Sequence, residues 1–197
     1  MRFIYLLPLF CILILSACND QETPKRVNGP SVKEQAPKMP VSSQLDNAGT
    51  TLITKLVTNY YGLKNALVAT NAAEADSAAL KLTVMAGLFQ TYLQHDSVHN
   101  SILKPYIDTI KTQSELIFSM PAKDEKCEKQ RLAFGTISSA LYGLVIHAGL
   151  KNAGIFHQFC PMAFNDKGAT WLSEESEIKN PYFGKKMLEC GETIDSL

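Results

Sequence analysis

The chain has 197 residues, of which 46% are hydrophobic, and it carries 19 basic and 19 acidic side chains. This length suits one domain with a tail, and the apolar fraction is too high for a disordered protein. The even charge balance provides neither the basic surface of a nucleic-acid-binding protein nor a polybasic membrane patch, so we expect no nucleic acid among its partners.

The N-terminus has the pattern of an export signal. Arg2 precedes an apolar run over residues 3–15, which is shorter than the roughly 20 residues that a membrane-spanning helix needs. Small residues at Ser16 and Ala17 stand before Cys18, and this arrangement resembles the bacterial lipobox, in which the cysteine is acylated. We therefore predict a signal peptide at residues 1–17 and a lipid on Cys18 that anchors the protein to an envelope membrane, facing the periplasm. An ordinary secretory signal, with Cys18 incidental, is the alternative.

The segment after the predicted lipid is a spacer. Residues 18–44 contain few large apolar side chains and several prolines among polar residues. Such a stretch buries too little surface to offset the entropy of ordering, so we expect a flexible linker. The folded domain is predicted to occupy residues 45–197.

Residues 45–149 are predicted to form four amphipathic helices. In the first helix, apolar residues recur at steps of three and four, as expected for one buried face. The second helix begins at Asn71, and Glu74 three residues later completes a capping box. The apolar positions of these two helices are Leu52, Ile53, Leu56, Val57, Tyr60, Leu63 and Leu67, then Ala75, Ala78, Leu82, Met85, Phe89 and Tyr92.

The third and fourth helices complete a bundle. The third covers about residues 98–119, and Pro105 must either open it or lie in its first turns. The fourth is predicted to start at Asp124 as N-cap and to end before Gly149. Their apolar positions are Ile102, Tyr106, Ile110 and Ile117, then Phe134, Ile137, Leu141, Leu144 and Ala148. Short connections favour an antiparallel up-down four-helix bundle.

Four residues of the bundle are candidate ligands that we interpret as structural. Cys127 falls on the apolar stripe of the fourth helix, where a cysteine behaves as a small buried hydrophobe. His95, His99 and His147 lie near helix ends and are interpreted as surface or capping residues.

In the tail, residues 150–191, the helical periodicity ends and β-forming residues become frequent. Residues 155–164 are rich in β-formers, residues 165–168 carry a turn signal, and residues 169–172 follow as a second strand. We predict a β-hairpin there, one short helical turn over residues 173–179, and another turn at Asn180 and Pro181. The expected fold is therefore mainly α, a four-helix up-down bundle followed by a small C-terminal β-hairpin and turn segment.

The tail also concentrates sulfur. Cys160 and Met162 are two residues apart, which places them on one side of an extended segment. Met187 and Cys190 are three apart, which places them on one side of a helical turn. If the two pairs meet, two thiolates and two thioethers surround one point, and such soft donors select Cu(I). Zinc is the alternative ion, with His157 as a further candidate ligand beside the cysteines.

A disulfide between Cys160 and Cys190 explains the same residues without a metal. Exported proteins occupy oxidising compartments in which paired cysteines usually bridge, and both methionines would then be packing residues. No C-x-x-C motif is present in the sequence, which disfavours a thiol oxidoreductase. The sequence shows neither a nucleophile–base pair nor an acid–base dyad, so we expect no enzyme activity.

Several segments resemble one known family, a bacterial envelope domain of unknown function. That domain occurs as a stand-alone lipoprotein and fused to the C-terminus of periplasmic adaptor subunits of copper and silver efflux pumps. The specific part of the resemblance lies in the tail, and the helices supply a weaker part. The segments are residues 159–173, 177–184 and 186–191, then 60–67, 130–134 and 139–142.

The resemblance implies a helical domain whose Cys-Pro-Met and Met-x-x-Cys elements handle a soft heavy metal. Carried over by position, these elements are Cys160 with Met162 and Met187 with Cys190. The implied role is copper tolerance, buffering or delivery, with an efflux adaptor or a periplasmic metal carrier as partner. The rival hypothesis is a structural or interaction lipoprotein with the two cysteines bridged.

Overall fold

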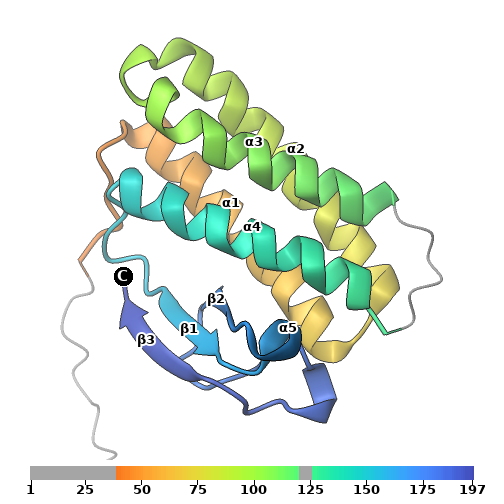
Figure 1. Ribbon diagram of the computed structural model, residues 1–197. Coiled ribbons are helices and arrows are strands. Elements are labelled where there is room, and N and C mark those ends of the chain that lie inside the picture. Colours follow the sequence, from red (N-terminus) through yellow and green to blue (C-terminus); the bar gives the residue numbers. More distant parts are fainter. Residues whose placement is uncertain (1–38, 120–125) are drawn as a thin grey trace, which may run out of the picture. The chain divides into compact units, whose positions relative to one another are not determined.

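The computed structural model describes residues 39–119 and 126–197 (Figure 1). The predicted signal peptide, Cys18 and most of the predicted linker lie outside the described residues. Asp124, the predicted N-cap of the fourth helix, also lies outside them. Within the described part of the chain, no helix combines the length and the hydrophobicity that crossing a membrane requires.

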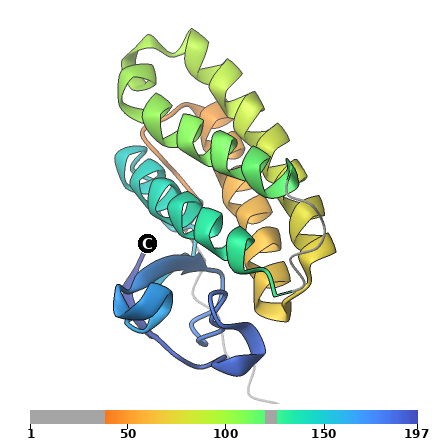
Figure 2. The same ribbon diagram turned by 45° about the vertical axis from the view of Figure 1, so that its right-hand side comes forward.

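Four long helices form the predicted bundle. They are α1 (Asn47–Ala69), α2 (Ala72–His95), α3 (Ser97–Ser119) and α4 (Glu128–His147). Consecutive helices lie side by side and run in opposite directions, as Figures 1 and 2 show from two sides. Their facing side chains make one hydrophobic core that contains almost all of the predicted apolar positions of α1, α2 and α4. The four-helix up-down prediction is confirmed.

The predicted start of the second helix at Asn71 is confirmed, although the backbone N–H of Asn71 donates to the Ala66 carbonyl and not to Glu74 as in a complete capping box. Asn71 is the N-cap of α2, and its side-chain oxygen accepts a hydrogen bond from the backbone N–H of Glu74 at 3.1 Å. In return, the Asn71 amide donates to the Glu74 carboxylate at 3.2 Å. Asp46 caps α1 in the same manner by accepting from the N–H of Gly49. These side chains satisfy amide groups that the first helical turn leaves without partners.

Helix α3 differs from its prediction in two respects. It begins at Ser97, so Pro105 lies in the third turn and removes a hydrogen bond to the carbonyl of Ser101. Ile102, which was predicted to be buried, is 51% exposed. The buried face is displaced by one position in the first half of the helix. Its buried residues are Leu103, Ile107, Ile110, Ser114 and Ile117.

The start of α4 also corrects the prediction. Its N-cap is Cys127, which adopts a left-handed conformation with φ of 56°, and its side chain makes no capping hydrogen bond. Cys127 is nevertheless fully buried in the hydrophobic core, as predicted. At the other end, Gly149 with φ of 62° follows the helix in the left-handed conformation that glycine adopts without strain.

The tail forms a three-stranded antiparallel sheet with the order β2-β1-β3. Strands β1 (Phe156–Cys160) and β2 (Ala169–Ser173) make the predicted hairpin, with Cys160 opposite Ala169. Their connection contains the short α5 (Ala163–Asp166), in which three consecutive residues from Phe164 onward have left-handed φ values. The third strand, β3 (Glu192–Ser196), pairs with β1 and was not predicted.

The sheet packs beside α4 (Figures 1 and 2). The connection from β2 to β3 covers part of the sheet. Trp171 and Leu172 of β2 are fully buried in the shared core. The predicted helical turn over residues 173–179 is wrong, because residues 174–177 form bends and the chain then continues without regular structure. The predicted turn at Pro181 is confirmed and leads into a short 3₁₀ helix, η1 (Gly184–Lys186).

Candidate functional site

The two tail cysteines meet. Cys160 ends strand β1, Cys190 lies in the connection before β3, and their Sγ atoms are 2.7 Å apart. Cys160 is fully buried, whereas Cys190 is partly exposed. The pair is therefore asymmetric, because solvent and ligands reach the sulfur of Cys190 and not that of Cys160.

A glycine lets the chain carry Cys190 this close to the sheet. Gly191 has φ of +145°, and a Cβ atom there would lie 2.7 Å from the carbonyl oxygen of Phe159 and 2.9 Å from the ring of Trp171. Only a residue without a side chain allows the connection to lie directly over β1 and β2 at this point. Cys190, one residue earlier, is thereby held beside the end of β1.

The two methionines share a groove that the thiols do not line. Met162 and Met187 both line a groove of about 640 Å³ together with the rings of Phe164, Tyr182 and Phe183. Neither Cys160 nor Cys190 lines that groove. Met162 is 45% exposed, so its thioether is accessible from outside.

Met187 links the groove to the thiol pair. It lines a second, shallower hollow of about 410 Å³ together with Cys190. Met187 and Cys190 lie on one turn, as predicted, because the N–H of Cys190 donates to the carbonyl of Met187 at 3.2 Å. The predicted pairing of Cys160 with Met162 on one strand does not occur, because β1 ends at Cys160 and Met162 lies in the following turn, where the alternation of an extended strand no longer applies.

His157 lies apart from the thiols. It is 7% exposed, and its ring stacks on Tyr142 of α4 with centroids 3.9 Å apart. Burial lowers the pKa of His157, and the nearby Asp195 carboxylate acts in the opposite direction. Its Nε2 atom is buried without a hydrogen-bond partner among the described residues. The structure thus places His157 against the bundle and does not join it to Cys160 and Cys190 as a zinc-binding set.

The Cys190 thiol is protonated at neutral pH. The hydrogen bond with Cys160 is the largest cause that raises the pKa of Cys190 to about 11, and burial adds to it. A hydrogen bond from the backbone N–H of Met162 acts in the opposite direction. Across residues 39–119 and 126–197, no group of three or more His, Cys, Asp and Glu side chains is arranged to hold a metal ion. A metal site here would therefore depend on thioether ligands and would have to displace thiol protons.

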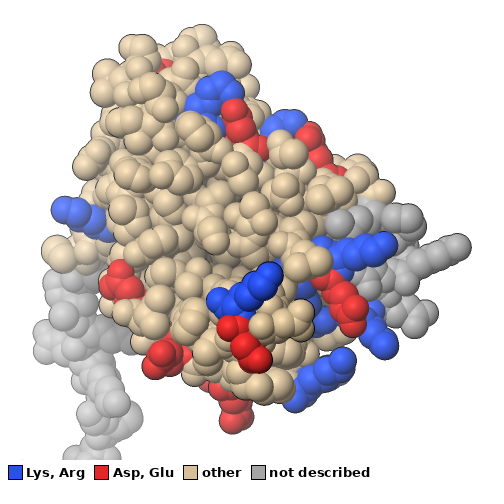
Figure 3. All heavy atoms as spheres, viewed as in Figure 1, with Lys and Arg blue, Asp and Glu red and all other residues tan. Residues whose placement is uncertain are grey.

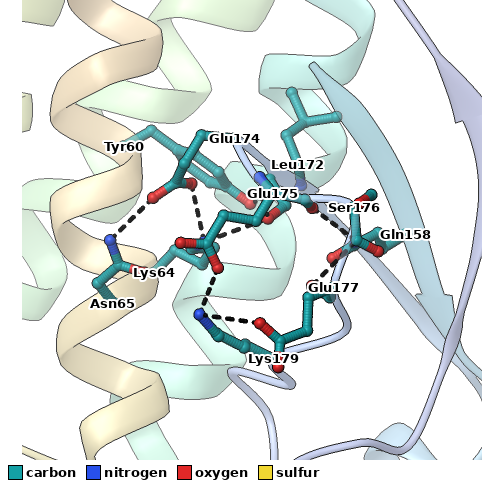
Figure 4. A network of polar contacts seen from close by, with 11 residues as sticks. Tyr60, Lys64, Asn65, Gln158, Leu172, Glu174, Glu175, Ser176, Glu177 and Lys179 are labelled. Atoms are coloured by element: carbon teal, nitrogen blue, oxygen red, sulfur yellow. Dashed lines mark hydrogen bonds and ion pairs between the residues drawn. The ribbon is translucent and has the colours of Figure 1, made fainter. Parts of the chain in front are cut away.

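An ion pair between a buried lysine and a partly exposed glutamate fixes the tail to the bundle (Figure 4). Lys64 of α1 is 1% exposed, and its Nζ atom lies 2.8 Å from the carboxylate of Glu174 and 3.3 Å from the Oγ atom of Ser173. Asn65 donates a second hydrogen bond to the Glu174 carboxylate at 3.0 Å. Burial raises the pKa of Glu174, but the hydrogen bonds from Lys64 and Asn65 outweigh it and leave that pKa below its usual range.

A second anchor lies at the other end of the same connection. Arg131 of α4 is buried, and its Nε atom donates to the carbonyl oxygen of Pro181 at 2.8 Å. Its NH2 group donates to the carbonyl of Leu67 and to the hydroxyl of Thr70, both at 3.0 Å. Arg131 therefore joins α1, α4 and the turn that precedes Met187 and Cys190.

Neither anchor was predicted from the sequence. Lys64 stands next to Leu63 on the buried side of α1, and a charge at such a position is the sequence signal that could have identified it. In the face shown in Figure 3, charged side chains lie mainly over the lower part, where the sheet and tail are, and few lie over the middle of the bundle. This face shows no continuous basic surface.

The match that comparisons with known proteins give is to a family, and it lies mainly in the helices. No curated protein and no solved structure matches it. A family match begins in α1 and ends at Ala153, so it covers most of the bundle but not the sulfur-bearing tail, where the more specific part of the resemblance described above lies. Residues 56–153 match the family described as a protein of unknown function, DUF3347.

Proposed function

We propose that this protein is a lipid-anchored envelope protein that binds a soft heavy-metal ion, above all Cu(I), at Cys160 and Cys190 with Met187 and Met162 as auxiliary ligands. The observation that supports this proposal best is the sulfur arrangement, in which two thiols 2.7 Å apart adjoin a hollow shared with Met187. Thiolate and thioether donors select Cu(I) over ions that prefer oxygen ligands. The anchor is the lipid predicted on Cys18.

The ion would move by ligand exchange. Met162 and Met187 are accessible from the groove, and Met187 also adjoins Cys190, so a thioether-bound ion can pass to the thiol pair. Two protons leave as the thiols become thiolates. Because metal–thiolate bonds are about 2.3 Å long, two sulfurs that share an ion stand farther apart than 2.7 Å, and the Cys190 loop must move outward. An efflux adaptor or a periplasmic metal carrier would receive the ion.

One observation favours a second candidate, a structural or interaction lipoprotein with a Cys160–Cys190 disulfide and no metal. The two Sγ atoms are already close enough that a small movement brings them to bonding distance. In an oxidising compartment such a pair bridges readily. A thiol oxidoreductase is less well supported, because the raised pKa of Cys190 leaves little of the attacking thiolate at neutral pH.

A cuprous titration separates the two candidates. Protein purified without oxygen is analysed for free thiols at Cys160 and Cys190 by alkylation and peptide mass mapping, then titrated with Cu(I) against a competing chelator. The metal proposal predicts two free thiols and one tightly bound ion, which Cys190→Ser removes. A fixed disulfide with no copper uptake would refute the metal proposal and leave the structural one.

The methionines provide a sharper version of the test. Met187→Leu should weaken Cu(I) binding more than Met162→Leu, because only Met187 lines the hollow with Cys190. Met85→Leu is the control, because Met85 lies on α2, packs against the bundle core, and lines neither the groove nor the hollow. Equal Cu(I) affinity in all three variants would exclude the thioethers as ligands.

A further inference from the structure

Asn180 is a buried polar residue whose hydrogen bonds all act on the loop that carries Cys190. Its side chain is fully buried, and its Nδ2 atom donates to the carbonyl oxygen of Cys190 at 2.7 Å. Its Oδ1 atom accepts from the backbone N–H groups of Tyr182 at 2.7 Å and Phe183 at 3.2 Å. One side chain thus joins the start of the loop directly to its end.

The backbone of Asn180 closes the same loop. Its N–H donates to the carbonyl of Leu188 at 2.8 Å, and its carbonyl accepts from the N–H of Gly184 at 3.0 Å. Between these contacts, Lys185, Lys186, Leu188 and Glu189 are exposed and contribute little to the core. The stretch from Lys185 to Glu189 is therefore ordered by polar contacts to Asn180 more than by hydrophobic burial, whereas the turn before it is also held by the burial of Tyr182 and by Arg131.

This arrangement sets where the Cys190 sulfur lies. Cys160 is fixed by the ladder of β1, so the distance between the two sulfurs depends on the Cys190 backbone. The hydrogen bond from Asn180 holds that backbone at the carbonyl of Cys190 itself. Without it, the loop would sample positions in which the Cys190 sulfur points away from Cys160, at an entropic cost to any step that needs both sulfurs.

We propose that Asn180 is the positioning residue of the thiol pair. Asn180 sets the effective concentration of the Cys190 thiol at Cys160. That effective concentration determines both the stability of a Cys160–Cys190 disulfide and the strength of metal binding. The disulfide half of this inference is independent of the function proposed above, and only the metal half rests on it.

The test measures the thiol–disulfide equilibrium of the full chain in glutathione redox buffers without metal. The Cys160–Cys190 disulfide is quantified by acid quench, alkylation and peptide mass mapping. Asn180→Asp keeps the acceptor for Tyr182 and Phe183 but replaces the donor to the Cys190 carbonyl with an oxygen. Loss of one buried hydrogen bond should lower the equilibrium constant for the disulfide about tenfold.

The matched control is Asn152→Asp. Asn152 also donates from its side-chain amide to a backbone carbonyl, that of Pro40 at 3.2 Å, but it lies outside the loop. In Asn152→Asp, the equilibrium constant for the Cys160–Cys190 disulfide should remain within twofold of the wild-type value. Helical circular dichroism establishes that each variant is folded. An Asn180→Asp protein that is folded and keeps the wild-type equilibrium constant would overturn the proposal.

A second measurement leaves Asn180 intact and tests the positioning role of Asn180 even if Asn180→Asp does not fold. In Cys190→Ala, hydrogen exchange of the Tyr182 and Phe183 amides should stay as slow as in the reduced wild type, because Asn180 orders the loop without the thiol. If both amides lose their protection, the thiol pair orders the loop and Asn180 is not the positioning residue. Failure of copper uptake in the titration above leaves both measurements unaffected.

Discussion

The Lys64–Glu174 pair, in which only the lysine is buried, makes an asymmetric prediction for stability. Removing the carboxylate with Glu174→Ala leaves an ammonium group that is 1% exposed, with the Ser173 hydroxyl at 3.3 Å and the Tyr61 ring as neutral partners and no counter-charge. Removing the ammonium with Lys64→Met keeps the apolar stem and leaves a carboxylate that is already 35% exposed. Glu174→Ala should therefore destabilise the protein more than Lys64→Met does.

The magnitudes follow from burial. Breaking a fully buried ion pair costs about 3–5 kcal/mol, and we expect about 2–3 kcal/mol for Glu174→Ala because water reaches the exposed side of this pair. Lys64→Met should cost about 1 kcal/mol, since Glu174 turns to solvent and keeps its bond to Asn65. The double variant should unfold close to Lys64→Met, because the ammonium that needs the carboxylate is then absent.

Urea denaturation followed by circular dichroism measures these differences at pH 7. The control is the neighbouring exposed pair of Lys179 and Glu175, drawn in the same view (Figure 4), for which Lys179→Met should leave the urea midpoint unchanged. The reasoning fails if Glu174→Ala is no more destabilising than Lys64→Met, or if the Lys179 variant matches them.

The same pair makes stability depend on pH. Because the folded-state pKa of Glu174 is lowered, its contribution is complete above the ordinary glutamate pKa of about 4.3 and disappears as the pH falls through the lowered value. The difference in unfolding free energy between wild type and Glu174→Gln should accordingly shrink as the solution is acidified below about pH 4. A difference that stays constant from pH 7 to pH 3 would contradict the assigned role of the carboxylate.

Three further predictions concern the tail and the helices. Oxidation of Cys160 and Cys190, 30 residues apart, should raise the free energy of unfolding by about 4 kcal/mol in the chain-entropy account; equal urea midpoints for oxidised and reduced protein would contradict it. Gly87→Ala should stabilise α2 by about 1 kcal/mol, because a Cβ there meets no atom within 4 Å. Gly135→Ala should not, because its Cβ would lie 2.9 Å from the Phe164 ring, and thermal melts compare the two. Cu(I) affinity should rise with pH between 6 and 9, because the Cys190 pKa of about 11 makes thiolate formation part of binding, and a flat profile in the chelator titration would refute this.

The bundle could be predicted because its pattern is local. Apolar residues at steps of three and four identify the buried faces of α1, α2 and α4 without knowledge of the tertiary fold. In α3, two apolar stripes interleave, and the buried one contains Ser114, whose hydroxyl donates to the carbonyl of Ile110. In the first half of this helix, Ile102 with Tyr106 and Leu103 with Ile107 both repeat at four-residue steps, so the period alone could not exclude Ile102 as the buried position.

The candidate site could be predicted only in its residue types. The rules for residues two and three apart assume a regular strand or helix, whereas Met162 and Cys190 lie in turns whose course depends on distant contacts. Strand β3 escaped prediction because all five of its residues are exposed and only Ile194 is strongly apolar. The turn at Asn180 has a sequence signal, but the bonds that Asn180 and Arg131 donate to the distant backbone carbonyls of Cys190 and Pro181 have none.

Disulfide formation and metal binding place opposite demands on one loop. A bridge needs the Cys190 sulfur to move toward Cys160, whereas a shared ion needs it to move away. Cys160 is fully buried at the end of β1 and cannot adjust, so the 180–190 loop alone makes both movements. The two states therefore exclude each other, and the oxidised protein should be closed to copper. Within this scheme, the reducing power around the protein decides whether the tail is a bridged structural element or a site for a soft ion.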